Sequence, residues 1–526
     1  MNIEQVTKQA SLLWPAAIEK VTGIRNGITE IVCGNDELPK VCGWLSNRRN
    51  YHFAGLIVEE NAERCDLFYL FAGQGEMGRI LLRTDTPIKK RLCKSICGEV
   101  HAADWHEREA EDLFGLVFEG HPRLGDFILH DDAWQEGVEP MRNGFDIDAT
   151  LANRRPSRNW RPRRIVDAPG AFIMPVGPIF SGDAESVHFQ LETIGEEVIR
   201  IFPRLFFKYR GVEKRAEGRA YDDALLMVER FAGTTAFSHA LAGCMAVEQL
   251  GDTEVPERAG VLRVFLSELE RFRHHLGTVA GICNSTGLVV AANQTAILEE
   301  EALRLSGSLT GHRYLFGMAV PGGLSRDLDD RACGKTVARA GGIVRRLNGI
   351  EKILINTSSF LDRIEEVGIV TREEARNHGL VGPVARGSGC CNDLRRMQPY
   401  AAYDAFKFRL PCEDEGDGYA RLRVLLTEAR EAVHLMEQAT GALRNGPVRV
   451  PCKPAEGVAL AGVEAPRGAT WHWIRIDDAG TVKRYRLITP SFTNWHGFHL
   501  AAENFAFQDF PIILATFGLS VAENDR

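Results

Sequence analysis

The chain has 526 residues, of which 25% are charged and 44% are hydrophobic, and its formal net charge at pH 7 is −8. This length predicts two or three domains, this composition is typical of a globular protein, and the negative charge argues against nucleic acid as a partner. The twelve cysteines include no Cys-x-x-Cys pair, which predicts free thiols in a reducing compartment and no iron–sulfur cluster held by this chain.

The first 125 residues read as a small α+β domain. Three short β-type runs predict strands at Gly55–Glu59, Cys65–Ala72 and Arg79–Arg83. Pro87–Cys97 predicts a helix, because proline suits a first helical turn. The acidic run from Trp105 to Gly115 predicts a solvated helix that ends at the glycine.

Residues 126–167 read as a linker, because aspartates, glycine and prolines interrupt any periodic pattern. They hold a basic cluster of Arg154, Arg155, Arg158, Arg161, Arg163 and Arg164. A solvated segment that docks on another subunit is the main interpretation, and binding of anionic lipid head groups is the alternative.

Residues 168–526 read as a mainly helical domain. Val187–Ile201 predicts two strands with a turn at Gly195, and Pro256–Ile282 predicts the clearest helix. Further helices are predicted at Glu299–Leu305, Asp327–Leu361 and Tyr419–Ala442. No segment predicts a transmembrane span. The adjacent Cys390 and Cys391 are interpreted as two unrelated thiols.

The segment from Phe231 to Val247 contains no charged residue, which predicts a helix buried on nearly all sides. It belongs to the frame Glu229-Arg230-x-x-Gly-x-x-x-x-x-His239, and the chain ends on Glu523-x-Asp525-Arg526. A buried carboxylate and a histidine have tunable pKa values, so these residues are candidates for proton transfer. The alternative is a structural Glu229–Arg230 pair and a hydrogen-bonded core histidine.

These motifs carry a resemblance to one family. Trp105–Gly115 and Phe118–Pro122 read Trp-x-Glu-Arg-Glu-x-x-Asp-Leu-Phe-Gly and Phe-Glu-Gly-His-Pro, and closely resemble the signature of the C subunit of respiratory complex I. The Glu229–His239 frame and the chain end resemble the metal motifs of [NiFe]-hydrogenase large subunits and the related D subunit of complex I. The fused order is most similar to the branch of hydrogenase-4 component G and the formate-hydrogenlyase large subunit.

The resemblance implies a fold and a domain division. Residues 1–125 are expected to form a small α/β sandwich like the C subunit, followed by the linker at 126–167. Residues 168–526 are expected to form a mainly helical hydrogenase-large-subunit-like domain with peripheral β-strands. The fold class is therefore α+β.

The resemblance also places four former nickel-ligand positions, and none of them holds a cysteine. They are Ala232, Thr235, Ser520 and Glu523. Because nickel in this setting requires thiolates, the sequence predicts no metal and argues against hydrogenase activity. The tyrosine of the complex I quinone site falls on Gly233, and its His-Pro-x-x-His loop falls on residues 180–184, so that arrangement is not kept either.

The function implied is a peripheral-arm subunit of a membrane-associated, complex I-like oxidoreductase, held by partners at the cytoplasmic face of the inner membrane. The expected partners are a small iron–sulfur subunit, other peripheral-arm subunits and antiporter-like membrane subunits, and any NAD(H) site would lie on another subunit. Arg210, Glu213, Arg219 and His275 are expected to face the partner's iron–sulfur cluster. Glu229, His239, Glu523 and Asp525 are the proton-transfer candidates.

Two functional hypotheses follow from the lost thiolates. In the first, the vacated site binds a quinone or another small acceptor, or couples redox change to membrane subunits. In the second, the chain is a non-catalytic scaffold and Phe231, Phe237, Phe517 and Leu519 fill the site. An open cavity between residues 229–239 and 517–526 favours the first hypothesis, and a packed interior favours the second.

Overall fold

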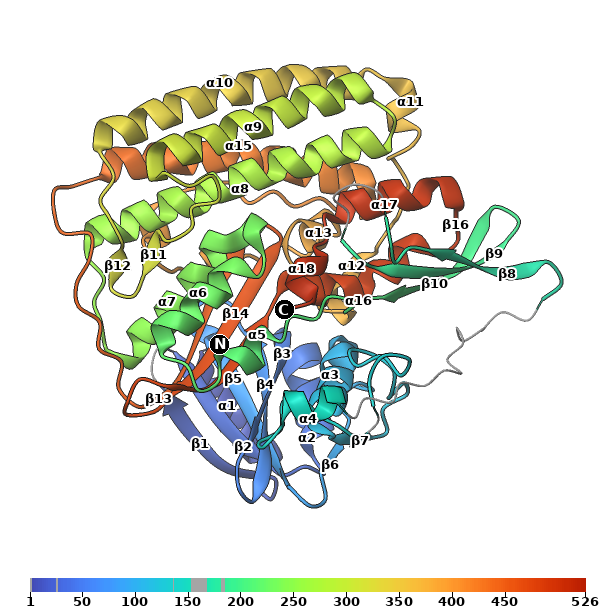
Figure 1. Ribbon diagram of the computed structural model, residues 1–526, viewed down its shortest axis with the longest axis vertical. Helices are drawn as coiled ribbons and strands as arrows, with labels where there is room; N and C mark the ends of the chain where they lie inside the picture. Colours follow the sequence, from blue (N-terminus) through green and yellow to red (C-terminus); the bar gives the residue numbers. More distant parts are fainter. Residues whose placement is uncertain (1, 25–26, 136, 153–167, 181–184) are drawn as a thin grey trace.

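The computed structural model describes the chain except for residues 1, 25–26, 136, 153–167 and 181–184 (Figure 1). The predicted basic cluster from Arg154 to Arg164 and most of the loop at 180–184 lie outside the described residues.

A five-stranded sheet organises the first part of the chain. Its strand order is β1 (Ile18–Ile24), β2 (Ile28–Cys33), β5 (Arg79–Pro87), β4 (Arg64–Ala72) and β3 (His52–Glu60), and only the β2–β5 pair is parallel. The three predicted strands are confirmed as β3, β4 and β5. Side chains alternate between two cores along β4: Tyr69 and Phe71 pack with Trp44, whereas Phe68 and Leu70 pack with Trp473.

The predicted helix at Pro87–Cys97 is wrong. Strand β5 continues to Pro87, and the short strand β6 (Leu92–Lys94) pairs in parallel with β7 (Val117–Glu119). Cys93 is fully buried there, and the Leu92 amide donates to Thr86 Oγ1 at 3.1 Å. This tertiary pairing overrides the local preference that a proline gives to a helix start.

The acidic helix α3 (Asp104–Phe114) ends as predicted, with Gly115 in the left-handed conformation at φ 65°. It is not solvated, however, since Glu107 and Glu109 are buried. Glu107 accepts hydrogen bonds from Ser95 Oγ at 2.5 Å and from the Ile96 amide at 2.8 Å. The acidic side chains of α3 are therefore internal binding partners and not surface charges.

Four long helices form one side of the molecule, where they lie next to one another (Figure 1). They are α8 (Glu257–Ser285), α9 (Val289–Thr310), α10 (Asp330–Ile355) and α15 (Gly418–Ala442). Helix α8 confirms the predicted helix and has Pro256 as its N-cap, and Gly287 at φ +82° separates it from α9. None of the described helices is both long and apolar enough to cross a membrane.

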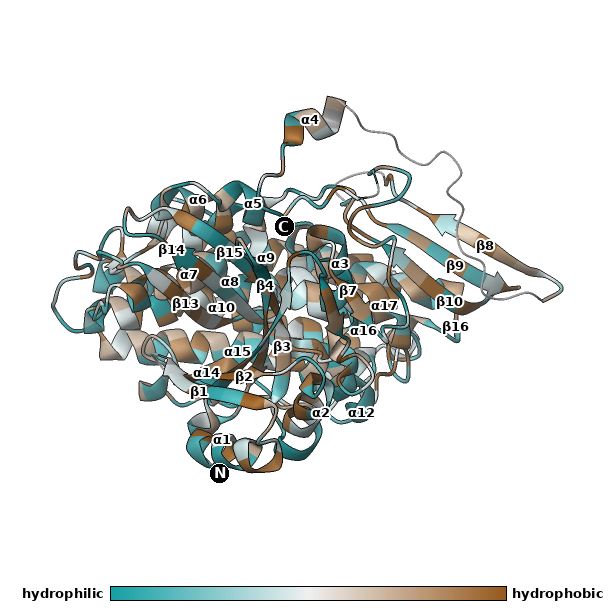
Figure 2. Ribbon diagram, turned by 90° about the horizontal axis from the view of Figure 1, so that it is seen from below, coloured by the Kyte–Doolittle hydropathy of each residue, from teal (hydrophilic) through white to brown (hydrophobic). Residues whose placement is uncertain are grey.

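Two further sheets correct the expectation of peripheral strands. Strands β13 (Gly457–Ala465), β14 (Gly468–Ile476) and β15 (Val482–Ile488) lie inside the molecule, between helix α7 (Ala236–Leu250) and the first sheet (Figure 1). Only the sheet of β8 (Ala171–Val176), β9 (His188–Ile194), β10 (Glu197–Arg204) and β16 (Phe505–Ala506) extends from the side of the body (Figure 2). β9 and β10 confirm the predicted strand pair.

One cysteine prediction is also wrong. Cys391 and Cys412 form a disulfide, with a sequence separation of 21 residues, while Cys390 is a free thiol. Cys390 and Cys391 are therefore not bonded to each other, as interpreted, but Cys391 is not a free thiol. The spacing of the cysteines in the sequence does not show that Cys412 lies next to Cys391 in the fold.

Candidate functional site

The two motifs that resemble metal motifs meet in the interior. Helix α6 (Tyr221–Arg230), a 3₁₀ turn (Gly233–Thr235) and α7 (Ala236–Leu250) supply one side, and the last helix, α18 (Val521–Asn524), supplies the other. Thr235 Oγ1 donates to Glu523 Oε1 at 2.6 Å, and both residues are fully buried. Residues 288 positions apart in the sequence therefore form one site.

Glu523 occupies the centre of this site. Ser491 Oγ donates to Glu523 Oε2 at 2.5 Å, and Arg467 Nη1 lies 3.1 Å from Glu523 Oε1. Burial disfavours the charged carboxylate, but Arg467, the neighbouring His239 and the hydrogen bond from Ser491 outweigh it and lower the pKa of Glu523 below its ordinary value. Glu523 is therefore a buried carboxylate that is ionised at neutral pH.

A row of buried polar side chains leads away from Glu523. His239 Nε2 lies 3.9 Å from Glu523 Oε1, and His239 Nδ1 lies 3.1 Å from His472 Nε2. His472 Nδ1 lies 3.0 Å from the Tyr485 hydroxyl. These three rings are fully buried, and burial lowers the pKa of His472 well below its ordinary value. The two imidazoles and the phenol lie at hydrogen-bond distance from one another, whereas Glu523 lies beyond that distance from His239.

The other two proton-transfer candidates, Glu229 and Asp525, accept hydrogen bonds from backbone amides outside this site. Glu229 Oε1 accepts from the Gly317 amide at 2.6 Å, and burial raises the pKa of Glu229. The Asp525 carboxylate accepts from the amides of Phe206 and Lys208, each at 2.9 Å. Burial raises the pKa of Asp525 to about 6, although these amides oppose the shift. Both carboxylates hold loops in place, and among the described residues no hydrogen bond or ion pair joins either of them to Glu523 or His239.

The residues expected to face a partner's iron–sulfur cluster do not form one group. Among the described residues, no hydrogen bond or ion pair joins His275 to Arg210, Glu213 or Arg219. Arg219 is exposed and Arg210 is half-buried. Glu213 is buried and forms ion pairs with Arg486 and Arg526.

His275 lies in the centre of a second, larger charge network. Its Nε2 lies 2.8 Å from Glu428 Oε2, and both residues are buried. The network continues through ion pairs and hydrogen bonds to Glu268, Arg271, Arg386, Asp393, Arg395, Tyr403 and Glu464. The His275 imidazole is fully enclosed by this chain, so its expected position near a partner's cluster stays a prediction.

The donors at the four former ligand positions do not fit nickel. Ala232 offers no donor atom, the Thr235 hydroxyl is committed to Glu523, and Ser520 Oγ accepts from the Glu523 amide at 3.2 Å as the N-cap of α18. The remaining carboxylate is paired with Arg467. Nickel in such a site requires soft thiolate ligands, and none of the residues that contact Glu523 is a cysteine.

Side chains fill the space where the metal motifs meet. Phe231 packs against the His239 ring at 4.6 Å between centroids, and Phe237 is fully buried. Phe517 instead packs against Phe498 and beneath Arg421. The polar contacts of Glu523 and the aromatic contact of His239 therefore occupy part of the space between the two motifs.

Four residues of the site were not predicted. Arg467 belongs to a Pro-Arg-Gly motif in the sequence, so this motif was a usable signal. His472 and Tyr485 reach the site from β14 and β15, and Ser491 reaches it from the first turn of α16 (Pro490–Ala502). No spacing or composition distinguishes these three from ordinary strand and helix residues.

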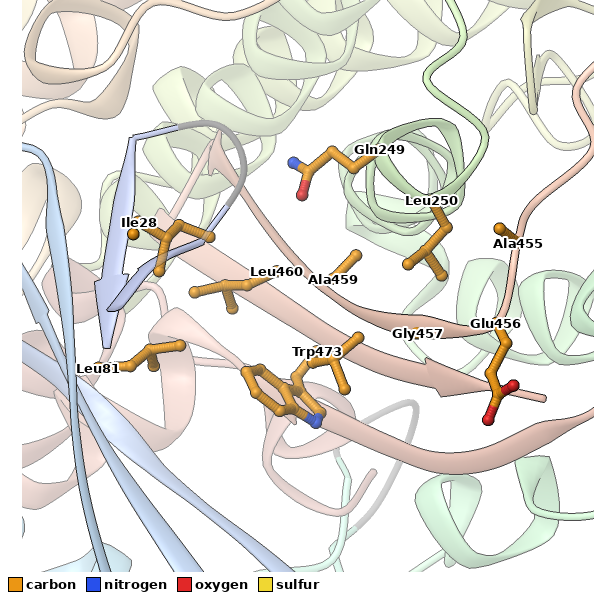
Figure 3. A pocket seen from close by; sticks show the side chains of 12 residues that line it. Ile28, Leu81, Gln249, Leu250, Ala455, Glu456, Gly457, Ala459, Leu460 and Trp473 are labelled. Atoms are coloured by element: carbon orange, nitrogen blue, oxygen red, sulfur yellow. The ribbon is translucent and has the colours of Figure 1, made fainter. Parts of the chain in front are cut away.

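A cavity of about 350 Å³ lies away from this site (Figure 3). Ile28 and Leu81 of the first sheet line one side, and Leu250, Leu460 and Trp473 line the other. It contains none of the predicted site residues. The cavity marks incomplete packing between the two parts of the chain.

Three family models match the sequence. The model of the 49 Kd subunit of respiratory-chain NADH dehydrogenase matches residues 287–454 and 450–526, and that of the 30 Kd subunit matches residues 31–151. The model of nickel-dependent hydrogenases matches residues 210–277. The order of the matches agrees with the fused C- and D-type organisation predicted from the motifs.

Individual proteins from hydrogenase and NADH-quinone oxidoreductase complexes are also similar to this chain. Formate hydrogenlyase subunit 5 of Escherichia coli is 28% identical over 97% of this chain and 87% of its own length, and hydrogenase-4 component G of the same organism is 27% identical over 99% and 88%. A D-type subunit of the NADH-quinone oxidoreductase of Herpetosiphon aurantiacus is 30% identical over 63% of this chain and 92% of its own length.

A solved structure is also similar. It is a chain of the membrane-bound sulfane sulfur reductase, an archaeal respiratory membrane complex, with a TM-score of 0.64 and 25% identity. The match covers 68% of this chain and 99% of the other. The fold match therefore extends over nearly the whole of that relative.

Proposed function

Because this chain belongs to the family of fused C/D-type subunits of complex I and hydrogenase-4-type complexes, we propose that it is the large peripheral-arm subunit of a membrane-associated, complex I-like oxidoreductase. A small partner subunit carries the iron–sulfur cluster, and other peripheral and antiporter-like membrane subunits complete the assembly. The chain is held at the cytoplasmic face of the membrane by these partners.

The observation that carries the proposal is the position of Glu523. A carboxylate that is ion-paired with Arg467 and hydrogen-bonded to Thr235 and Ser491 takes a former ligand position. This site contains no nickel, and it couples redox change to proton position. An iron–sulfur cluster on a partner subunit would supply the electron. His239 is the group that holds one proton to balance the added charge, and that proton reaches it through Tyr485 and His472, which lie one after the other at hydrogen-bond distance.

A packed site also favours the scaffold hypothesis as a second candidate. Phe231, Phe237 and the Glu523 ion pair occupy the space in which a quinone or another acceptor would have to bind. Under this candidate the acceptor binds on another subunit, and the buried network serves only to hold the chain in shape. The two candidates differ in the effect of neutralising Glu523 on electron transfer.

We expect Glu523→Gln to lower the rate of quinone-analogue reduction by the purified complex by about 100-fold, the usual contribution of a positioned proton donor or acceptor. The amide keeps the shape of the side chain but cannot be ionised beside Arg467. The measurement compares turnover with the amount of assembled complex on a native gel. Loss of turnover in a fully assembled complex supports coupling.

The matched control is Glu300→Gln, since Glu300 is an exposed carboxylate that also pairs with arginines, Arg304 and Arg313. It should leave turnover unchanged. Normal turnover in an assembled Glu523→Gln complex would instead establish the scaffold role. Stoichiometric nickel in the wild-type complex, with proton-reduction activity, would refute both candidates.

A further inference from the structure

A cluster of imidazoles lies where the first part of the chain meets the second. His101 belongs to a 3₁₀ turn (His101–Ala103), His378 follows helix α12 (Arg372–Asn377), and His496 lies on α16 (Pro490–Ala502). The ring centroids are 4.5 Å apart for His101 and His378, 4.9 Å for His378 and His496, and 5.1 Å for His101 and His496. One nitrogen from each ring lies within 4.8 Å of the other two.

Neighbouring groups orient two of the rings. His378 Nδ1 lies 3.1 Å from the Glu374 carbonyl oxygen, which can only accept a hydrogen bond, so Nε2 of His378 has the free lone pair. His496 Nε2 lies 3.3 Å from Asp104 Oδ2 without forming a hydrogen bond. Metal-binding histidines are commonly oriented by such carbonyl and carboxylate neighbours.

The site is enclosed and has an unsatisfied polar atom. His378 is 8% exposed and His496 is 4% exposed. Within the described residues, both ring nitrogens of His496 are buried without a hydrogen-bond partner. A buried polar atom without a partner is costly unless a ligand satisfies it. One nitrogen of this ring is among the three that lie within 4.8 Å of one another and could converge on a cation.

A second layer of donors surrounds the three rings. Asp104 bridges His496 to His121, whose Nε2 lies 3.2 Å from Asp104 Oδ1. Cys97 Sγ lies 3.9 Å from His101 Nδ1. Cys97, Asp104 and His121 form an adjacent group with donor atoms within 4.8 Å of one another. The carboxylate, imidazole and thiol types present are those that zinc prefers.

We propose that His101, His378 and His496 bind a divalent transition-metal ion of the zinc class, with a water or a further ligand at the fourth position. Three neutral imidazoles suit Zn²⁺ and leave a four-coordinate site open at one position. His101 comes from the first part of the chain, whereas the other two ligands come from the second part. The bound ion therefore joins the two parts and stabilises their contact.

The test uses the full chain, stripped of metal with a chelator, and titrated with ZnCl₂ at pH 7.5. We expect one zinc ion per chain by calorimetry and a higher midpoint of thermal unfolding when zinc is bound. His378→Ala should abolish both effects. His434→Ala is the matched control, since His434 is an exposed histidine on α15, and it should bind zinc as the wild type does.

X-ray absorption on the zinc-loaded wild type keeps the test independent of how well the variant folds. The expected spectrum contains imidazole scattering from three nitrogen ligands. A chain that binds no zinc, a His378→Ala chain that binds it as tightly as the wild type, or a spectrum without imidazole scattering would overturn the proposal. A spectrum dominated by sulfur would move the site to Cys97 and equally reject the three-histidine assignment.

Discussion

Arg386→Met is expected to destabilise the chain by about 3–5 kcal/mol, the cost of leaving buried carboxylates without their partner. Arg386 is fully buried, and its guanidinium lies 2.7 Å from Glu428 Oε1 and 3.0 Å from Glu464 Oε1. Asp393 Oδ2 lies 3.5 Å from the same group. Methionine keeps much of the volume but removes the charge. The midpoint of urea unfolding measures the effect.

The defect of this variant should depend on pH. Burial and the neighbouring Asp393 raise the pKa of Glu464 to about 7, against the opposing effect of Arg386. A carboxyl group with a raised folded pKa costs stability as pH rises from its unfolded value through its folded value. Removal of Arg386 raises this pKa further, so the loss of stability should be smaller at pH 5.5 than at pH 8.

Arg304→Met is the control for Arg386→Met. Arg304 also pairs with a carboxylate, Glu300 at 2.8 Å, but its side chain is 75% exposed. An exposed i,i+4 pair contributes about 0.3–0.5 kcal/mol, so this variant should unfold close to the wild type. Equal shifts for the two variants would mean that the buried network does not stabilise the fold.

Arg526→Ala is expected to have the second-largest effect, also about 3–5 kcal/mol. Arg526 is fully buried, with Nη2 2.5 Å from Glu109 Oε1 and Nε 3.2 Å from Glu213 Oε1. Arg486 completes the cluster through ion pairs to the same two carboxylates. Because Glu109 belongs to the first part of the chain, the variant should weaken the contact between the two parts. Thermal unfolding and limited proteolysis measure this.

Arg219→Ala serves as the comparison, because Arg219 lies in the same region of the sequence as Glu213 but is exposed. It should change the free energy of unfolding by less than about 0.5 kcal/mol. We expect the protease to cut the Arg526→Ala variant between its two parts and to leave the Arg219→Ala variant intact. Identical resistance of both variants would show that the cluster does not join the parts.

The sequence predicted those elements whose pattern is local. Helix α8 repeats its apolar residues at helical spacing, and β4 reads as a short continuous apolar run because both of its faces are buried, so both could be recognised. The helix expected at Pro87–Cys97 failed because β6 pairs with β7, a tertiary contact that local preference does not encode. The burial of Glu109 was equally hidden, since its partner Arg486 is 377 residues away.

The candidate site was predictable to a similar extent. The motif frames correctly suggested that His239 and Glu523 belong together, and the structure places them 3.9 Å apart. They also suggested Glu229 and Asp525, whose carboxylates turn out to hold backbone amides. The proximity of His472 to His239 could not be predicted, because a single histidine on a strand has no spacing relation to the motifs.

The long separation between Glu109 and Arg486 has a consequence for biosynthesis. One face of the first sheet carries Phe68, which packs against Trp473 with ring centroids 5.1 Å apart. Trp473 cannot cover this ring until the second part of the chain has been synthesised. A ribosome that adds residues at the usual rate needs on the order of tens of seconds to reach these partners. During that interval the nascent chain exposes an apolar face and an unpaired carboxylate. Exposed apolar surface promotes aggregation, which binding by a chaperone would prevent.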